Sequence, residues 1–157
     1  ILESKTKVRF QDCDPFNHLN NAKYLDYFIN QREDQVELEY DLNIFKHLKQ
    51  TGKCWVVGSN QIVYLKPAFL MEEIIIETKL IHFDEKSIRV EMKMYNNDKT
   101  QLKALLWIRF IYFDAKSQKS TSHPEELLNL FESVIVPQTA KTFEEKCLQI
   151  MTKKKAN

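Results

Sequence analysis

A run of β-type segments between Cys54 and Phe113 limits the possible folds more than any other feature of the sequence. Strand-forming residues, β-branched and aromatic, dominate four segments: residues 54–65, 74–83, 87–95 and 102–113. Two of the links, 84–86 and 96–98, are short and polar. The four strands are therefore expected to form an antiparallel meander.

An aromatic helix is predicted to precede these strands, from Ala22 to about Glu39. Helical spacing gives it one apolar stripe made of Leu25, Phe28, Ile29 and Val36 and widened by Tyr24 and Tyr27. Asn20 or Asn21 can cap its first turn. A half-buried strand is expected just before it, over residues 6–11, with Val8 and Phe10 facing the same way. The later sheet is expected to wrap this helix.

Shorter helices are predicted on either side of the sheet. Residues 43–50 are expected to be helical and to end at Gly52. After the strands, Ser122 is the expected cap of a helix with Pro124 at its first position. A last amphipathic helix places four apolar residues on one side: Phe143, Cys147, Ile150 and Met151. The chain therefore predicts one α+β domain over residues 1–157, with a core at about 5–115 and a C-terminal helical extension at about 122–153.

Composition excludes several classes of function. A net charge of +1 gives no field that favours nucleic acid, and no window of 18 apolar residues could span a membrane. Two glycines are too few for a glycine-rich phosphate loop. Three widely spaced cysteines fit neither a disulfide framework nor a zinc signature, and the first ten residues lack the layout of a secretory signal. We expect a cytoplasmic protein without a metal or cofactor.

The turn over residues 12–20 holds the residues best suited to chemistry. A calcium loop is excluded because Phe16 stands where a ligand is needed and Lys23 where the terminal Glu should bind. A Cys13–His18 nucleophile pair lacks any sign of a lowered thiol pKa. A single carboxylate, Asp14, can act as base or nucleophile beside the N–H groups of a helix N-terminus. The alternative, that Asp12 and Asp14 only form the turn, stays open on these grounds.

The segment VRFQDCDPFNHLNNAKYLDYF resembles the opening motif of the hotdog-fold thioesterases, both the 4-hydroxybenzoyl-CoA thioesterase and YbgC-like group and the acyl-ACP thioesterases. The likeness continues through VVGSNQIVYLKPAFLMEEIIIET and covers about residues 5–115. It implies a curved antiparallel sheet wrapped around one long central helix. It also implies dimers or tetramers paired sheet edge to sheet edge, with active sites at the subunit boundary.

The resemblance assigns roles within the turn. The second Asp of the D-x-D motif is the family's catalytic carboxylate, which implies that Asp14 is catalytic and Asp12 structural. A histidine four residues later belongs to the catalytic set of the acyl-ACP thioesterases, and His18 fills that position. The asparagine that those enzymes carry between the two is Phe16 here, and Met71-Glu72 replaces a common Gly-Asp.

We therefore predict hydrolysis of an acyl-CoA or acyl-carrier-protein thioester, with Asp14 and His18 as catalytic residues. Three residues are predicted to contact the substrate: Asn20, Asn21 and Tyr24. A homo-oligomer is expected, with no nucleic-acid or membrane partner. Two alternatives keep the fold: a non-catalytic acyl-binding or assembly module, and a dehydratase of β-hydroxyacyl thioesters with His18 as base.

Overall fold

The computed structural model describes residues 1–156, with side chains as far as Lys153. In chain order the strands and helices are β1 (Leu2–Lys7), α1 (Tyr24–Tyr40), α2 (Ile44–Thr51), β2 (Lys53–Tyr64), β3 (Glu73–Phe83), β4 (Ser87–Asn96), β5 (Leu102–Asp114), β6 (Lys119–Ser120), α3 (Glu125–Val134) and α4 (Phe143–Ala156). Two 3-10 turns, Phe10–Asp12 and Asn21–Lys23, lie between β1 and α1.

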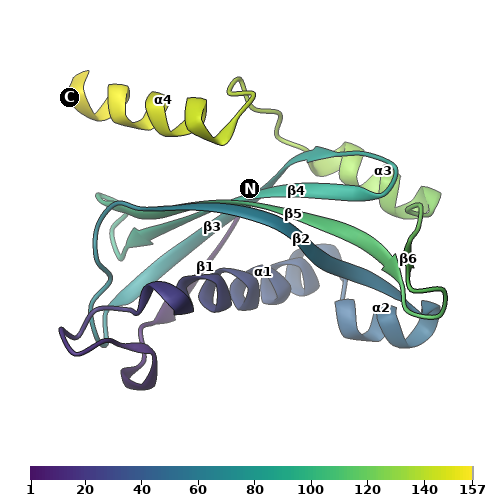
Figure 1. Cartoon of the computed structure of the whole chain (residues 1–157), viewed down its shortest axis with the longest axis horizontal. Coiled ribbons are helices and arrows are strands. Elements are labelled where there is room, and N and C mark those ends of the chain that lie inside the picture. The colour runs from purple at the N-terminus through teal and green to yellow at the C-terminus, as the bar shows by residue number, and fades with distance from the viewer. Residues whose placement is uncertain (157) are drawn as a thin grey trace.

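One curved antiparallel sheet dominates the molecule, in the order β1-β3-β4-β5-β2, with β6 paired to the end of β5. Figure 1 shows α1 lying along the concave side of this sheet and α4 on the opposite side, whereas α3 contributes Leu127 and Phe131 to the same apolar core as α1. This is the α+β arrangement expected, with the sheet curled around the long helix. Among the described residues, no helix is long and apolar enough to cross a membrane.

The expected meander is only partly correct. Strands β3, β4 and β5 follow one another as neighbours, but β2 pairs with β5 at one edge of the sheet, and β1 forms the other edge beside β3. The link from β2 to β3, residues 65–72, is long enough to carry the chain across the end of the sheet. Local alternation identifies a strand but does not specify its neighbour, so it could not show that β2 pairs with β5 instead of β3.

The first strand also differs from its prediction. It ends at Lys7, and Phe10 begins a 3-10 turn with 76% of its surface exposed instead of sharing a face with Val8. Val8 is fully buried because its backbone pairs with the 65–72 link: its N–H donates to Glu72 O and its carbonyl accepts from Met71 N. The link therefore holds the chain where β1 ends and the turn begins.

Alternating side chains divide the core into two layers. On β4, Val90, Met92 and Met94 face α1 in the concave core, while Glu91 faces the other way. A second cluster lies beneath α4: Ile81, Leu105, Trp107, Ala140 and Phe143. Helix α2 begins and ends as expected, capped by the Asn43 side chain and by Gly52 at φ 73°. At α3, Pro124 is the N-cap, and Ser122 donates to Glu85 instead of capping the helix.

Candidate active site

A closed loop at one end of α1 is built around Asp14. Its Oδ1 accepts from the backbone N–H of Phe16 (2.9 Å) and of His18 (3.0 Å), and its own N–H donates to His18 O (2.8 Å). Asn17 takes the left-handed conformation, φ 61°, which asparagine tolerates better than most residues. Among the described residues, no hydrogen bond reaches Asp14 Oδ2. One carboxylate oxygen therefore fixes the loop, and the other is available for chemistry.

The second aspartate of the turn is held differently. Tyr27 donates its hydroxyl to Asp12 Oδ2 at 2.6 Å and accepts from the backbone N–H of Arg9 at 3.0 Å. Burial, with the bond to Asp12, raises the pKa of Tyr27 to about 12. Asp12 therefore fastens the turn to α1. In the sequence, the helical position of Tyr27 indicates only packing in the apolar stripe and gives no sign of the bond to Asp12.

The residues predicted to contact substrate lie at the start of α1. Asn20 caps the 3-10 turn, since its Oδ1 accepts from Ala22 N (3.0 Å), and its backbone N–H donates to Asp12 O. Asn21 is exposed, and its carbonyl accepts from the hydroxyl of Tyr64 at the end of β2 (3.1 Å). Tyr24 is buried, and its ring meets that of Tyr64 edge to face. Asn20 therefore helps to close the turn and Asn21 is exposed beside it, whereas Tyr24 packs in the core.

His18 is tied to Asp14 through the backbone, while its ring packs elsewhere. The imidazole lies edge to face against Phe69 at 5.2 Å, and the two residues form an isolated β-bridge. Leu19 N donates to Ala68 O, and Leu70 N donates to Asn17 O. The turn over residues 12–20 is thus held along its length by the 65–72 link.

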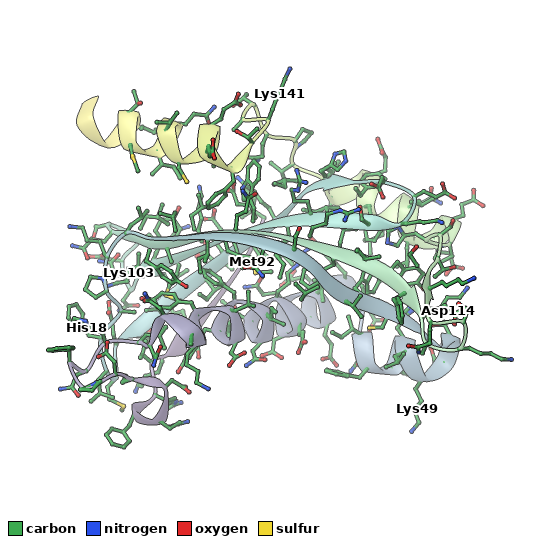
Figure 2. All side chains as sticks on the ribbon, viewed as in Figure 1. His18, Lys49, Met92, Lys103, Asp114 and Lys141 are labelled. Atoms are coloured by element: carbon green, nitrogen blue, oxygen red, sulfur yellow. The ribbon has the colours of Figure 1, made fainter. Side chains whose placement is uncertain are left out.

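A buried lysine supports that link from the sheet. Lys103, on β5, is 2% exposed, and its Nζ lies 3.0 Å from Glu72 Oε2 and donates to Pro67 O at 2.8 Å. Glu72 Oε1 accepts from Phe69 N (2.9 Å). Figure 2 shows Lys103 at the same end of the molecule as His18. Sequence reasoning missed this residue, although a lysine inside the most apolar strand was a visible signal.

An apolar cavity of about 260 Å³ lies between the sheet and the second half of α1, near α2 and α3. Its lining includes Val36, Trp55, Val57, Val90, Phe110 and Phe131. Two charged residues of α1, Arg32 and Glu33, also line it, and Arg32 donates from Nη1 to Thr78 Oγ1 at 2.8 Å. The cavity is at the end of β2 opposite to the one that meets Asn21.

Other chemistries find little support at the turn. Burial and the nearby Asp14 and Asp12 carboxylates raise the pKa of the Cys13 thiol, which disfavours a thiolate nucleophile. Within residues 1–156, no group of three or more His, Cys, Asp or Glu side chains is placed to hold a metal ion. The turn therefore offers one anchored carboxylate beside the start of a helix.

Comparison with known proteins gives consistent matches. A family model described as the thioesterase-like superfamily matches residues 8–131. Long-chain acyl-CoA thioesterase FadM from Escherichia coli (strain K12) is 27% identical over 134 residues, which make up 85% of this chain and 99% of that protein.

Solved structures share the fold. The probable thioesterase YbaW from Escherichia coli has a TM-score of 0.73 at 26% identity, with 87% of this chain and 100% of that chain covered. The protein SAV2348 from Staphylococcus aureus, solved in complex with CoA, has a TM-score of 0.78 at 15% identity, with 91% and 89% covered. The likeness to the thioesterase structures confirms the expected hotdog fold.

Proposed function

Because the chain belongs to the thioesterase-like superfamily, we propose that it hydrolyses long-chain acyl-CoA to a free fatty acid and the CoA thiol. The relative FadM, whose name states that activity, is matched over almost its whole length. The match supports CoA over a carrier protein as the thiol carrier. The three free cysteines support the cytoplasmic location expected from the sequence.

The half-anchored carboxylate of Asp14 is the observation that carries this proposal. Two backbone N–H groups hold Oδ1 and so fix the direction of the whole carboxylate, while Oδ2 has no hydrogen bond among the described residues. A general base or a nucleophile needs this combination of a fixed position and a free lone pair. A turn-forming aspartate needs only the first.

Hydrolysis then follows one of two balanced routes. As base, Asp14 takes a proton from water, the hydroxide oxygen bonds to the thioester carbon, and the C–S bond breaks as the thiolate leaves and is protonated. As nucleophile, Asp14 bonds to that carbon directly, expels the thiolate and forms an anhydride that water cleaves. In both routes the negative charge that develops on the carbonyl oxygen is stabilised by N–H groups at the start of the α1 segment.

His18 fits a positioning role in this arrangement. Its main-chain N–H and carbonyl both bond to Asp14, so the residue fixes the carboxylate whichever way its ring points. Phe16, 78% exposed, places an apolar ring two residues after Asp14, where the acyl-ACP thioesterases that the motif resembles carry an asparagine. We infer that Phe16 contacts the acyl or pantetheine part of the substrate and does not take part in proton transfer.

A dimer would bring the apolar cavity to the carboxylate. Strand β2 forms an edge of the sheet, and its central residues 56–61 are all exposed. Such an edge pairs readily with a second copy of itself. An antiparallel pair centred between Gly58 and Ser59 would place Lys53 of each chain opposite Tyr64 of the other. Since Tyr64 contacts Asn21 and the cavity lies near the start of β2, each cavity would face the Asp14 of the other chain.

A panel of acyl-CoA thioesters from short to long chains tests the activity. Release of free thiol that increases with chain length supports the proposal, because the long chain fills the apolar cavity. A change in enoyl absorbance without thiol release would instead indicate the dehydratase, and binding without turnover would indicate the acyl-binding module. Either result would overturn the proposed hydrolysis.

A further inference from the structure

A row of basic residues crosses the convex face of the sheet. The strand register places His82 of β3 beside Arg89 of β4, Arg89 beside Arg109 of β5, and Arg109 beside Ser59 of β2. Their neighbours Val90 and Ile108 belong to the concave core, so the two arginines project to the other face. The row lies away from Asp14 and is not used in the hydrolysis proposed above.

The two arginines form a pair that the fold alone would not favour. Like charges directly opposite each other on neighbouring strands repel and destabilise the sheet. Among the described side chains, neither guanidinium lies within 4.0 Å of a carboxylate oxygen, and neither makes a hydrogen bond to another residue. Arg89 gains some stabilisation because it lies 5.9 Å from the centre of the Trp107 ring. Among the described residues, no aromatic ring stabilises Arg109 in this way.

The carboxylate that lines the same cavity, that of Asp84, is already engaged. Asp84 Oδ1 accepts from the backbone N–H of Lys86 (2.9 Å) and of Ser87 (2.7 Å), and so closes the turn between β3 and β4. Although burial opposes it, these bonds and the charge of Arg109 lower the pKa of Asp84. The carboxylate therefore moderates the positive charge from the edge of the site but is fixed in the turn.

A polar cavity of about 360 Å³ covers this pair. It is lined by both arginines, His82, Asp84 and Ser87, and is bounded by Gln138 and Lys141 of the α3–α4 link. In Figure 2 the Lys141 side chain extends outward, away from the sheet. Cavities of this size accept small-molecule ligands.

We propose that this cavity binds a phosphate-bearing small molecule, with the Arg89 and Arg109 guanidinium groups sharing one phosphate. Two adjacent guanidinium groups offer paired N–H donors in the planar arrangement that phosphate oxygens accept. A dianionic group also removes the repulsion between them, which a neutral ligand cannot do. Two sources share this chemistry: the phosphates of CoA itself, and a separate phosphorylated metabolite. Only the first source rests on the proposed function.

Binding and stability together test the assignment. Thermal unfolding of the full chain at low ionic strength is followed while pyrophosphate, adenosine 3′,5′-bisphosphate or CoA is titrated in, against NaCl of equal ionic strength. The compared variants are Arg109→Gln, Arg89→Gln and the control Lys119→Gln, which removes one exposed cation from β6. Without ligand, Arg109→Gln should raise the Tm by roughly 1–3 °C, because it relieves the like-charge pair.

We expect saturable stabilisation of the parent protein and of Lys119→Gln, and an affinity at least 10-fold weaker in both arginine variants. If the arginine variants also raise KM for acyl-CoA at unchanged kcat, CoA is the source; if KM is unchanged, the ligand is a separate metabolite. The assignment is overturned if the parent responds no more to phosphates than to NaCl. It is also overturned if Arg109→Gln binds as tightly as Lys119→Gln. Thiol release by the parent is measured separately, so failure of this site and failure of the hydrolysis are distinguishable.

Discussion

Removing the buried charge of Lys103 should destabilise the protein and loosen the turn that holds Asp14. The Lys103 side chain is 2% exposed and its ammonium group contacts Glu72 Oε2 and Pro67 O, so Lys103→Met deletes two polar contacts at nearly constant side-chain length. Breaking one side of a buried ion pair costs about 3–5 kcal/mol. The Glu72 side chain keeps 21% of its exposure and can be partly solvated, so we expect about 2–3 kcal/mol.

For a chain of this length, that loss corresponds to a Tm lower by about 4–12 °C. A double-mutant cycle with Glu72→Gln isolates the pair, because glutamine can still accept from Phe69 N. Chemical unfolding of the four proteins should give a coupling energy of about 1–3 kcal/mol, and Lys103→Met should also lower kcat. If the two single effects add within about 0.5 kcal/mol, the ion pair does not support the link as described.

Three further changes test other parts of the structure. Burial lowers the pKa of His123, whose Nε2 accepts from Trp55 Nε1. The unfolded chain therefore takes up the proton first as the pH falls, and stability should decrease below about pH 6.5. In thermal unfolding between pH 5 and 8, His123→Gln should flatten this dependence, and an unchanged slope would contradict the role given to His123. Met71 has φ 65°, so Met71→Gly should raise stability by about 0.5–1 kcal/mol while Met71→Ala should not, and an equal gain from both would exclude backbone strain as the cause. In the proposed dimer, Val57 of one chain lies opposite Asn60 of the other, so the double variant Val57→Lys, Asn60→Lys would place like charges across the axis. It should sediment as a monomer where the parent sediments as a dimer, and a monomeric parent would refute the pairing through β2.

Much of the fold could be predicted because its signals are local. The strand-forming residues over 87–95 identified β4, and Gly52 marked the end of α2. The neighbour of β2 and the end of β1 depend on contacts distant in sequence. The pairing of Val8 with the 65–72 link is one such contact, and no periodicity indicates it.

Part of the candidate site could likewise be predicted from local sequence, and part could not. The D-x-D spacing and the asparagine cap predicted Asp14, His18 and Asn20 in one turn, and the structure brings them together there. The support from Lys103 and the bond from Tyr27 to Asp12 could not be predicted, because each joins the turn to a residue whose position is set by the tertiary fold. The Arg89–Arg109 pair likewise depends on strand register.

The activity of Asp14→Asn with a long-chain acyl-CoA tests the central claim most directly. Asparagine keeps an oxygen that can accept from the N–H groups of Phe16 and His18, so the turn and the Tm should be preserved. Loss of the base or nucleophile should lower kcat by about 10²–10⁴-fold with little change in KM. Thiol release at the parent rate by a folded Asp14→Asn protein would contradict the account.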